Sequence, residues 1–201
     1  MIEEKNGSLP TVAENERRNK RFKGVYDPLK GVGAYGERRE FDASHWRLWV
    51  VYLPLRMFDN PLFNAGMSAT MFREMRHRYD FEYWCADCVK IHNKETRRVE
   101  PFILNHPQRR LLAVMEKMRE EGKPVRVILL KARQWGGSTL TQLYMAWWQI
   151  VLHENCHSVI CSHLKDTSSA IRAMYNRVLA NYPEGLGLQA EIPETKQKAI
   201  P

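Results

Sequence analysis

The residue types best suited to chemistry lie in one short stretch, which reads Lys131-Ala132-Arg133-Gln134-Trp135-Gly136-Gly137-Ser138-Thr139. The stretch joins an apolar, strand-like segment to an apolar, helix-like segment. Adjacent glycines, two basic residues and two hydroxyls at such a junction suit a phosphate, because backbone N–H groups and a helix N-terminus then point at one anion. A phosphate-binding loop is therefore our first hypothesis, and an ordinary glycine-containing turn is the alternative.

The loop matches the standard phosphate-loop pattern G-x-x-x-x-G-K-[ST] only in part. Gly136 and Ser138 occupy the positions of the second glycine and the hydroxyl, whereas Lys131 replaces the first glycine and Gly137 replaces the lysine. A lysine at the start of the loop can still reach over it to the β- and γ-phosphates of a nucleotide, while Ser138 offers its oxygen to Mg²⁺. The pattern therefore predicts a nucleotide site with a displaced lysine.

Two other groups of residues have the composition of metal sites. The run His153-Glu154-Asn155-Cys156-His157 matches H-E-x-x-H, but that motif needs one continuous helix, and we expect the helix to end within it. Cys85, Cys88 and His92 offer three zinc ligands. Because a second pair of ligands is missing nearby, burial of the two cysteines as small apolar residues is the favoured interpretation.

The segments that must position the loop alternate between strand and helix patterns. Apolar runs predict strands over 125–130, buried on both faces, and 157–161, with helices over 138–152 and 167–181. This order predicts an α/β fold with a parallel sheet. Ahead of it, Asn105 is a good N-cap for a helix over 107–121, which Gly122 ends.

The first hundred residues lack the strand–helix alternation and predict an arm followed by a mainly helical region. Residues 1–40 are polar and rich in turn residues, and five of the seven residues from Arg17 to Lys23 are basic, so we expect a flexible basic arm. Residues 41–104 predict a mainly helical region with a β-hairpin. The expected elements are a short strand over 49–53, helices over 68–77 and 80–90, and a hairpin that pairs 89–91 with 99–104.

Composition limits the class of protein. The 201 residues include 31 Lys and Arg against 23 Asp and Glu, a formal net charge of +8, which favours an anionic partner. No apolar run approaches the roughly 20 residues needed to cross a bilayer, and the polar start lacks the apolar region of a signal peptide. Four cysteines are too few for a disulfide framework, so we expect a reduced, cytoplasmic protein without a membrane partner.

Three blocks of the sequence, in the same order, resemble the large subunits of phage terminases, the ATPases that package DNA into capsids. The first block is Phe102 to Gln108, the second is the loop Lys131 to Leu140, and the third is Val159 to Thr167. The resemblance extends from about Tyr79 to Tyr182, roughly half of the chain. It implies that 105–201 form the N-terminal part of a P-loop ATPase domain, with an incomplete parallel sheet.

The resemblance also implies roles for single residues. Lys131 would be the displaced Walker A lysine, Arg133 would act in cis on the γ-phosphate, and Gln108 would read the adenine. The loop residues 131–139 would hold ATP, and Ser138 would bind Mg²⁺ through the nucleotide. The implied function couples ATP hydrolysis to DNA translocation into the capsid.

The family's remaining machinery has no counterpart in this sequence. After Ser138 no apolar strand ends in Asp-Glu, so we expect the Walker B carboxylate and the nuclease domain to lie outside it, and ATP turnover by this chain alone to be weak. The partners implied are double-stranded DNA, the portal protein, the small terminase subunit and further copies of the chain in a host-cell motor. The alternative is a non-catalytic basic module that binds DNA or a protein partner through a degenerate loop.

Overall fold

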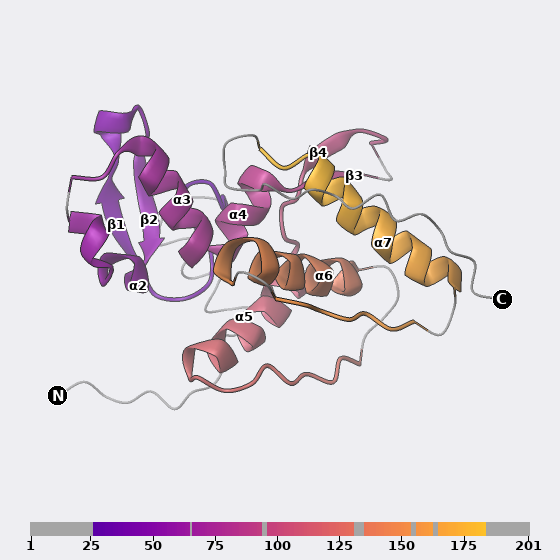
Figure 1. The fold of residues 1–201 in the computed structure, drawn as a ribbon. Helices are drawn as coiled ribbons and strands as arrows, with labels where there is room; N and C mark the ends of the chain where they lie inside the picture. Colours follow the sequence, from indigo (N-terminus) through magenta and orange to yellow (C-terminus); the bar gives the residue numbers. More distant parts are fainter. Residues whose placement is uncertain are drawn as a thin grey trace.

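A computed structural model of the chain describes residues 26–64, 66–93, 96–130, 135–153, 156–162 and 165–183. The fold mixes helices with strands, as predicted, and the described strands form two separate antiparallel hairpins (Figure 1). Each hairpin lies beside a separate hydrophobic core, and helices α3 and α4 connect the two regions.

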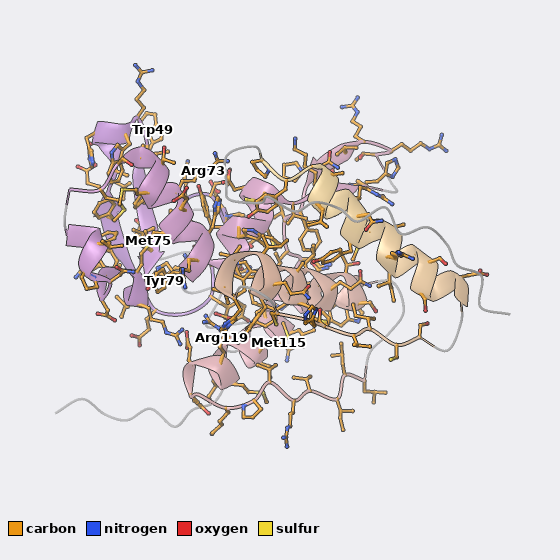
Figure 2. All side chains as sticks on the ribbon, viewed as in Figure 1. Trp49, Arg73, Met75, Tyr79, Met115 and Arg119 are labelled. Carbon is orange, nitrogen blue, oxygen red and sulfur yellow. The ribbon has the colours of Figure 1, made fainter. Side chains whose placement is uncertain are left out.

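The first core lies against the N-terminal hairpin. Strand β1 (Arg38–Asp42) pairs with β2 (Val50–Pro54), and helices α2 (Leu55–Phe58) and α3 (Ala69–Tyr79) cover it. Ser68 caps α3 by accepting a hydrogen bond from the N–H of Met71, as its sequence position predicts. Short 3₁₀ turns at Ser44–Trp46 and Pro61–Asn64 complete the unit. Its buried side chains include Val51, Leu53, Met57 and Phe72, whereas Trp49 projects from the hairpin edge (Figure 2).

Residues 26–40, which the sequence assigns to the flexible arm, are folded. Asp27 and Val32 form an antiparallel bridge, and Val32, Ala34 and Tyr35 are buried. The reason is a long-range contact that local composition does not reveal: the backbone N–H of Tyr35 donates to the carboxylate of Glu82, 2.6 Å away. The basic run from Arg17 to Lys23 lies outside the described residues.

The second core gathers the elements around the candidate loop. These are α4 (Phe81–Cys88), the hairpin β3 (Lys90–His92) and β4 (Val99–Pro101), α5 (His106–Glu120), α6 (Gly137–Trp147), a π-helical turn (Trp148–Leu152) and α7 (Lys165–Ala180). The sequence predicted this hairpin and all four α-helices to within a few residues. Apolar and aromatic side chains pack between the helices, among them Phe81, Trp84, Leu112, Leu140 and Trp147. Trp147 and Tyr144 are core residues, as the helical spacing indicates.

The predicted parallel sheet is not formed among the described residues. Segments 125–130 and 156–161 are extended, but neither pairs with a strand, and their apolar side chains face solvent. Ile128 and Leu130 are fully exposed, so the prediction of a strand buried on both faces is wrong for this structure. The physical reason is that a strand satisfies its backbone through neighbours, and the described part of the chain gives these segments none.

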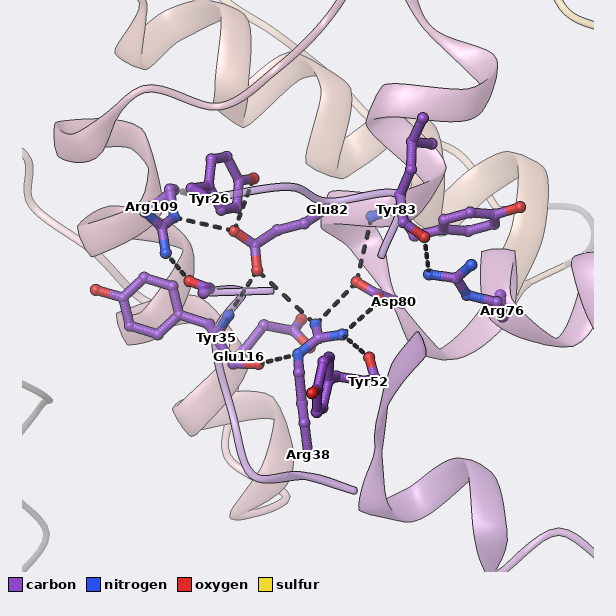
Figure 3. A network of polar contacts seen from close by, with 12 residues as sticks. Tyr26, Tyr35, Arg38, Tyr52, Arg76, Asp80, Glu82, Tyr83, Arg109 and Glu116 are labelled. Carbon is purple, nitrogen blue, oxygen red and sulfur yellow. Dashed lines mark hydrogen bonds and ion pairs between the residues drawn. The ribbon is translucent and has the colours of Figure 1, made fainter. Parts of the chain in front are cut away.

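A buried polar network joins the two cores (Figure 3). Arg38, on β1, contacts Asp80 at 2.7 Å, and Arg109, on α5, contacts Glu82 at 3.2 Å. Asp80 also caps α4, since its side chain accepts a hydrogen bond from the N–H of Tyr83. The network thus fixes α5 relative to the N-terminal hairpin. In the described part of the chain, no helix has both the length and the apolar character needed to span a bilayer.

Candidate functional site

The start of α6 has the backbone geometry of a tight turn into a helix. Gly136 is the N-cap, with φ of 81°, a left-handed conformation that favours glycine. A Cβ on Gly136 would lie 2.4 Å from Nε2 of Gln108, so a side chain there would have to displace the Gln108 amide. Ser138 follows in the first turn of α6 and is exposed. The first N–H groups of the helix and a hydroxyl therefore lie together at an accessible helix N-terminus.

Two side chains at the start of α5 hold this loop. Asn105 and Gln108 form a capping box: Oδ1 of Asn105 accepts from the N–H of Gln108 at 3.0 Å, and Oε1 of Gln108 accepts from the N–H of Asn105 at 2.9 Å. Their amide nitrogens then reach across to the loop. Nδ2 of Asn105 donates to the carbonyl of Trp135, and Nε2 of Gln108 donates to the carbonyl of Gly136, both at 3.1 Å.

Gln108 is buried, and its amide is engaged on both sides. The resemblance gives this residue the role of adenine reader, whereas the contacts in this structure give it a positioning role. It connects the N-terminus of α5 to the N-terminus of α6. The sequence predicted Asn105 as a helix cap, but the second contact that Asn105 and Gln108 each make is visible only in three dimensions.

The structure places only part of the predicted loop. Lys131, Ala132, Arg133 and Gln134 lie outside the described residues. Of the other predicted site residues, Gly137 is buried, whereas Trp135, Gly136 and Thr139 are half-buried. Trp135 packs against the second core. The described half of the loop is thus anchored to α5 and to the core.

Burial and ion pairing shift the pKa values of Asp80 and Glu82, the two carboxylates of the polar network. Burial raises the pKa of Glu82, although Arg38 and Arg109 both act to lower it. Burial also acts to raise the pKa of Asp80, but the ion pair and hydrogen bonds with Arg38 outweigh it, so that the pKa of Asp80 is lowered. Arg38 and Asp80 therefore form a charged pair whose two members depend on each other.

Cys85 and Cys88 are both buried, the interpretation that the sequence favours, and the alternative zinc cluster of Cys85, Cys88 and His92 is not assembled. Cys85 is buried in the second core, and His92 is exposed on β3. Instead, Cys88 lies beside His77 of α3, with Sγ 3.3 Å from Nε2, and the same Nε2 lies 2.6 Å from Oδ2 of Asp87.

These three side chains do not have the geometry of a nucleophilic triad. In a triad, the base contacts the nucleophile through one ring nitrogen and the orienting carboxylate through the other. Here a single nitrogen, Nε2 of His77, faces both Cys88 and Asp87. Burial also raises the pKa of the Cys88 thiol to about 12, which opposes formation of a thiolate nucleophile.

The H-E-x-x-H match fails for the expected reason. The π-helical turn ends at Leu152, and His153 has an extended backbone with φ of −138° and ψ of 127°. His157 lies in the extended segment 156–161. The two histidines therefore do not share a helical face, and Glu154 and Asn155 lie outside the described residues.

Sequence reasoning missed the partners of Cys88 and of Glu82. His77 and Asp87 come from two different helices, and no spacing rule connects them. Arg109 lies in the predicted helix over 107–121, where nothing local marks it, yet it is buried against Glu82 and the carbonyl of Gly33. Comparisons with protein-family models, with curated proteins and with solved structures find no match for the chain.

Proposed function

We propose that this chain is the ATP-binding part of a viral DNA-packaging motor of the terminase type. The observation that carries the proposal is the contact between two of the sequence blocks that resemble this family. Asn105 and Gln108, from the first block, hydrogen-bond to the carbonyls of Trp135 and Gly136, from the second. A phosphate loop fastened to the preceding helix is a reasonable arrangement for a nucleotide site, and nothing in the composition requires the two blocks to meet.

Three features at the start of α6 support the proposal of an ATP phosphate site. Gly136 has a backbone that favours glycine, Ser138 is exposed, and a helix N-terminus offers N–H groups to an anion. Lys131 and Arg133 would add positive charge from the front of the loop, and Ser138 would offer its oxygen to Mg²⁺. ATP·Mg²⁺ supplies the free energy of phosphate transfer when it is bound, and the residues of this chain bind and orient it.

The path of the chain around α6 is also compatible with a nucleotide-binding α/β unit. In Figure 1, segment 125–130 and segment 156–161 run in the same direction, and α6 between them runs in the opposite direction. This alternation is that of a strand–helix–strand unit. We propose that both segments become neighbouring parallel strands in the complete ATPase sheet, which would cover their exposed apolar side chains.

The proposal extends to partners. The net charge of +8 favours double-stranded DNA as the substrate that is moved, and the resemblance suggests the portal protein, the small terminase subunit and further copies of this chain as neighbours in a host-cell cytoplasmic motor.

Thermal unfolding with and without ATP·Mg²⁺ tests the proposal. At a nucleotide concentration 100 times the Kd, binding stabilises the folded state by about 2.7 kcal/mol. For a chain of this size we expect the Tm to rise by about 5–10 °C. An unchanged Tm at millimolar ATP·Mg²⁺ would contradict nucleotide binding and favour the alternative, a basic module with a degenerate loop.

A further inference from the structure

The clearest unassigned group of side chains lies where α3 and α4 meet, well separated in sequence from the candidate loop. His77, Asp87 and Cys88 each offer one ligand atom, and the three atoms lie within 4.8 Å of one another. The ligand atoms have different chemistry: an imidazole nitrogen, a carboxylate oxygen and a thiol sulfur. His77 and Cys88 are buried, and the side chain of Asp87 is 19% exposed, which leaves an approach from solvent.

We propose that His77 Nε2, Asp87 Oδ2 and Cys88 Sγ form a zinc-binding site. Three ligand atoms this close together suit a metal ion, and the shared use of Nε2 does not suit a nucleophilic triad. A mixed nitrogen, oxygen and sulfur set suits Zn²⁺, whereas Mg²⁺ and Ca²⁺ prefer oxygen ligands alone. Three protein ligands leave the fourth position of the tetrahedron to water.

The present distances lie close to those that zinc would impose. Metal–ligand bonds of about 2.0–2.3 Å in a tetrahedron separate nitrogen from oxygen by about 3.4 Å and nitrogen from sulfur by about 3.6 Å. The corresponding distances here are 2.6 Å and 3.3 Å. Zinc would therefore need Nε2 of His77 to move away from each of the other two ligand atoms by less than about 1 Å. Binding forms a Zn–S bond, and the proton of the Cys88 thiol passes to solvent.

Groups around the three ligands hold them in place. Arg73 binds both oxygens of Asp87: its Nη2 lies 3.1 Å from Oδ1, and its Nε lies 2.7 Å from Oδ2, the oxygen that the ion would share with it (Figure 2 labels Arg73). Trp147 of α6 donates to the backbone carbonyl of His77 at 2.7 Å, and the ring of Tyr83 stacks on that of His77. Such outer contacts orient metal ligands and raise affinity.

The test uses the full reduced chain, stripped of metal by a chelator and titrated with Co²⁺ as a spectroscopic probe, without nucleotide. We expect one equivalent of Co²⁺ to give the near-ultraviolet absorbance of a thiolate–cobalt bond and the visible bands of tetrahedral coordination, both lost when Zn²⁺ is added. Cys88→Ser and His77→Gln should each lower the Co²⁺ affinity at least tenfold. The matched control Cys85→Ala removes a neighbouring buried thiol and should leave the titration unchanged.

Two results would overturn the site. One is a wild-type chain that gives no thiolate–cobalt absorbance, and the other is an absorbance that Cys88→Ser retains. X-ray absorption of the zinc-loaded wild type tests the ligand set without any variant: one sulfur with nitrogen and oxygen neighbours is expected, and two or more sulfurs would contradict it. Since this site does not rest on the proposed function, its failure would leave ATP binding untouched.

Discussion

At the scale of single residues, the structure constrains the type of Gly136 in two ways. The residue combines a left-handed backbone with a Cβ position that Gln108 already fills. Gly122, at the end of α5, has a similar φ of 67° but open space where a Cβ would be. An alanine at Gly122 would cost only backbone strain, whereas an alanine at Gly136 would also displace the buried amide of Gln108. Comparing the two substitutions therefore measures the two costs separately.

We predict that Gly136→Ala lowers the free energy of unfolding by about 2–3 kcal/mol, because the methyl group adds the loss of the Gln108 hydrogen bonds to the cost of a left-handed alanine. Gly122→Ala should cost only about 1 kcal/mol, the backbone part alone. Urea denaturation measures both values. Equal losses in the two variants would show that Gln108 moves aside freely and does not hold the loop.

At the scale of elements, side chains at the N-terminus of α5 hydrogen-bond to the backbone that leads into α6. Asn105 both caps its own helix and fastens the loop at Trp135. These two roles can be separated, because serine is as good an N-cap as asparagine but lacks the amide nitrogen that donates to Trp135.

Replacement of Asn105 by alanine should lower the free energy of unfolding by about 1–2 kcal/mol, while Asn105→Ser should cost much less. Both variants should weaken ATP binding, since both release Trp135. Ser68→Ala, which removes the cap of α3, is the control that costs stability without affecting nucleotide. Denaturation and nucleotide titration of the three variants check this. Wild-type affinity in Asn105→Ser would contradict a role of α5 in shaping the site.

At the scale of the whole molecule, the Arg38–Asp80 pair connects the two cores. The loss of stability that follows its removal should depend on pH. We predict that Arg38→Met costs about 3–5 kcal/mol at pH 7, because it leaves Asp80 charged and buried without its main partner. In the wild type the pKa of Asp80 is lowered, so its stabilising contribution is present above about pH 4 and is lost as the pH falls further. In the variant we expect burial to outweigh the attractions that remain, so that the pKa of Asp80 rises. Protonation of Asp80 at lower pH then reduces the loss of stability.

The difference in stability between Arg38→Met and the wild type should therefore shrink as the pH falls from 7 to 4. Arg56→Met is a matched control, since Arg56 contacts Glu120 at 3.6 Å with both side chains exposed, and it should change stability by less than about 0.5 kcal/mol at either pH. Urea denaturation at the two pH values gives the comparison. A loss that is constant with pH would show that Asp80 is not the group left uncompensated.

Local signals in the sequence predicted the helices and the second hairpin well, because caps such as Ser68 and Asn105 and apolar spacing act over a few residues. The same signals failed where the outcome depends on distant partners. Residues 26–40 looked like a flexible arm until Glu82 and Arg109 supplied buried contacts. Segment 125–130 has the composition of a buried strand, but burial requires sheet neighbours, and these are not present among the described residues.

The candidate site shows the same division. The sequence indicated the glycines and the hydroxyl of the loop, but not the side chains of α5 that fasten it. It favoured burial of Cys85 and Cys88, which the structure confirms, but it gave no sign of the cluster of Cys88 with His77 and Asp87, which forms through the packing of α3 on α4.

Nucleotide titration of four variants shows whether the phosphate loop has its lysine at the front. Removing a charge-assisted contact of roughly 1.5–3 kcal/mol predicts that Lys131→Ala binds ATP·Mg²⁺ about 10–100 times more weakly than the wild type. Lys123→Ala, which removes an exposed lysine after α5, should bind as the wild type does.

Gly137→Lys should restore affinity in the Lys131→Ala background, since ordinary phosphate loops place their lysine there. Gly137→Lys alone shows whether the position tolerates a side chain. Equal affinity of the wild type and Lys131→Ala would contradict the displaced lysine and, with it, the account of this loop.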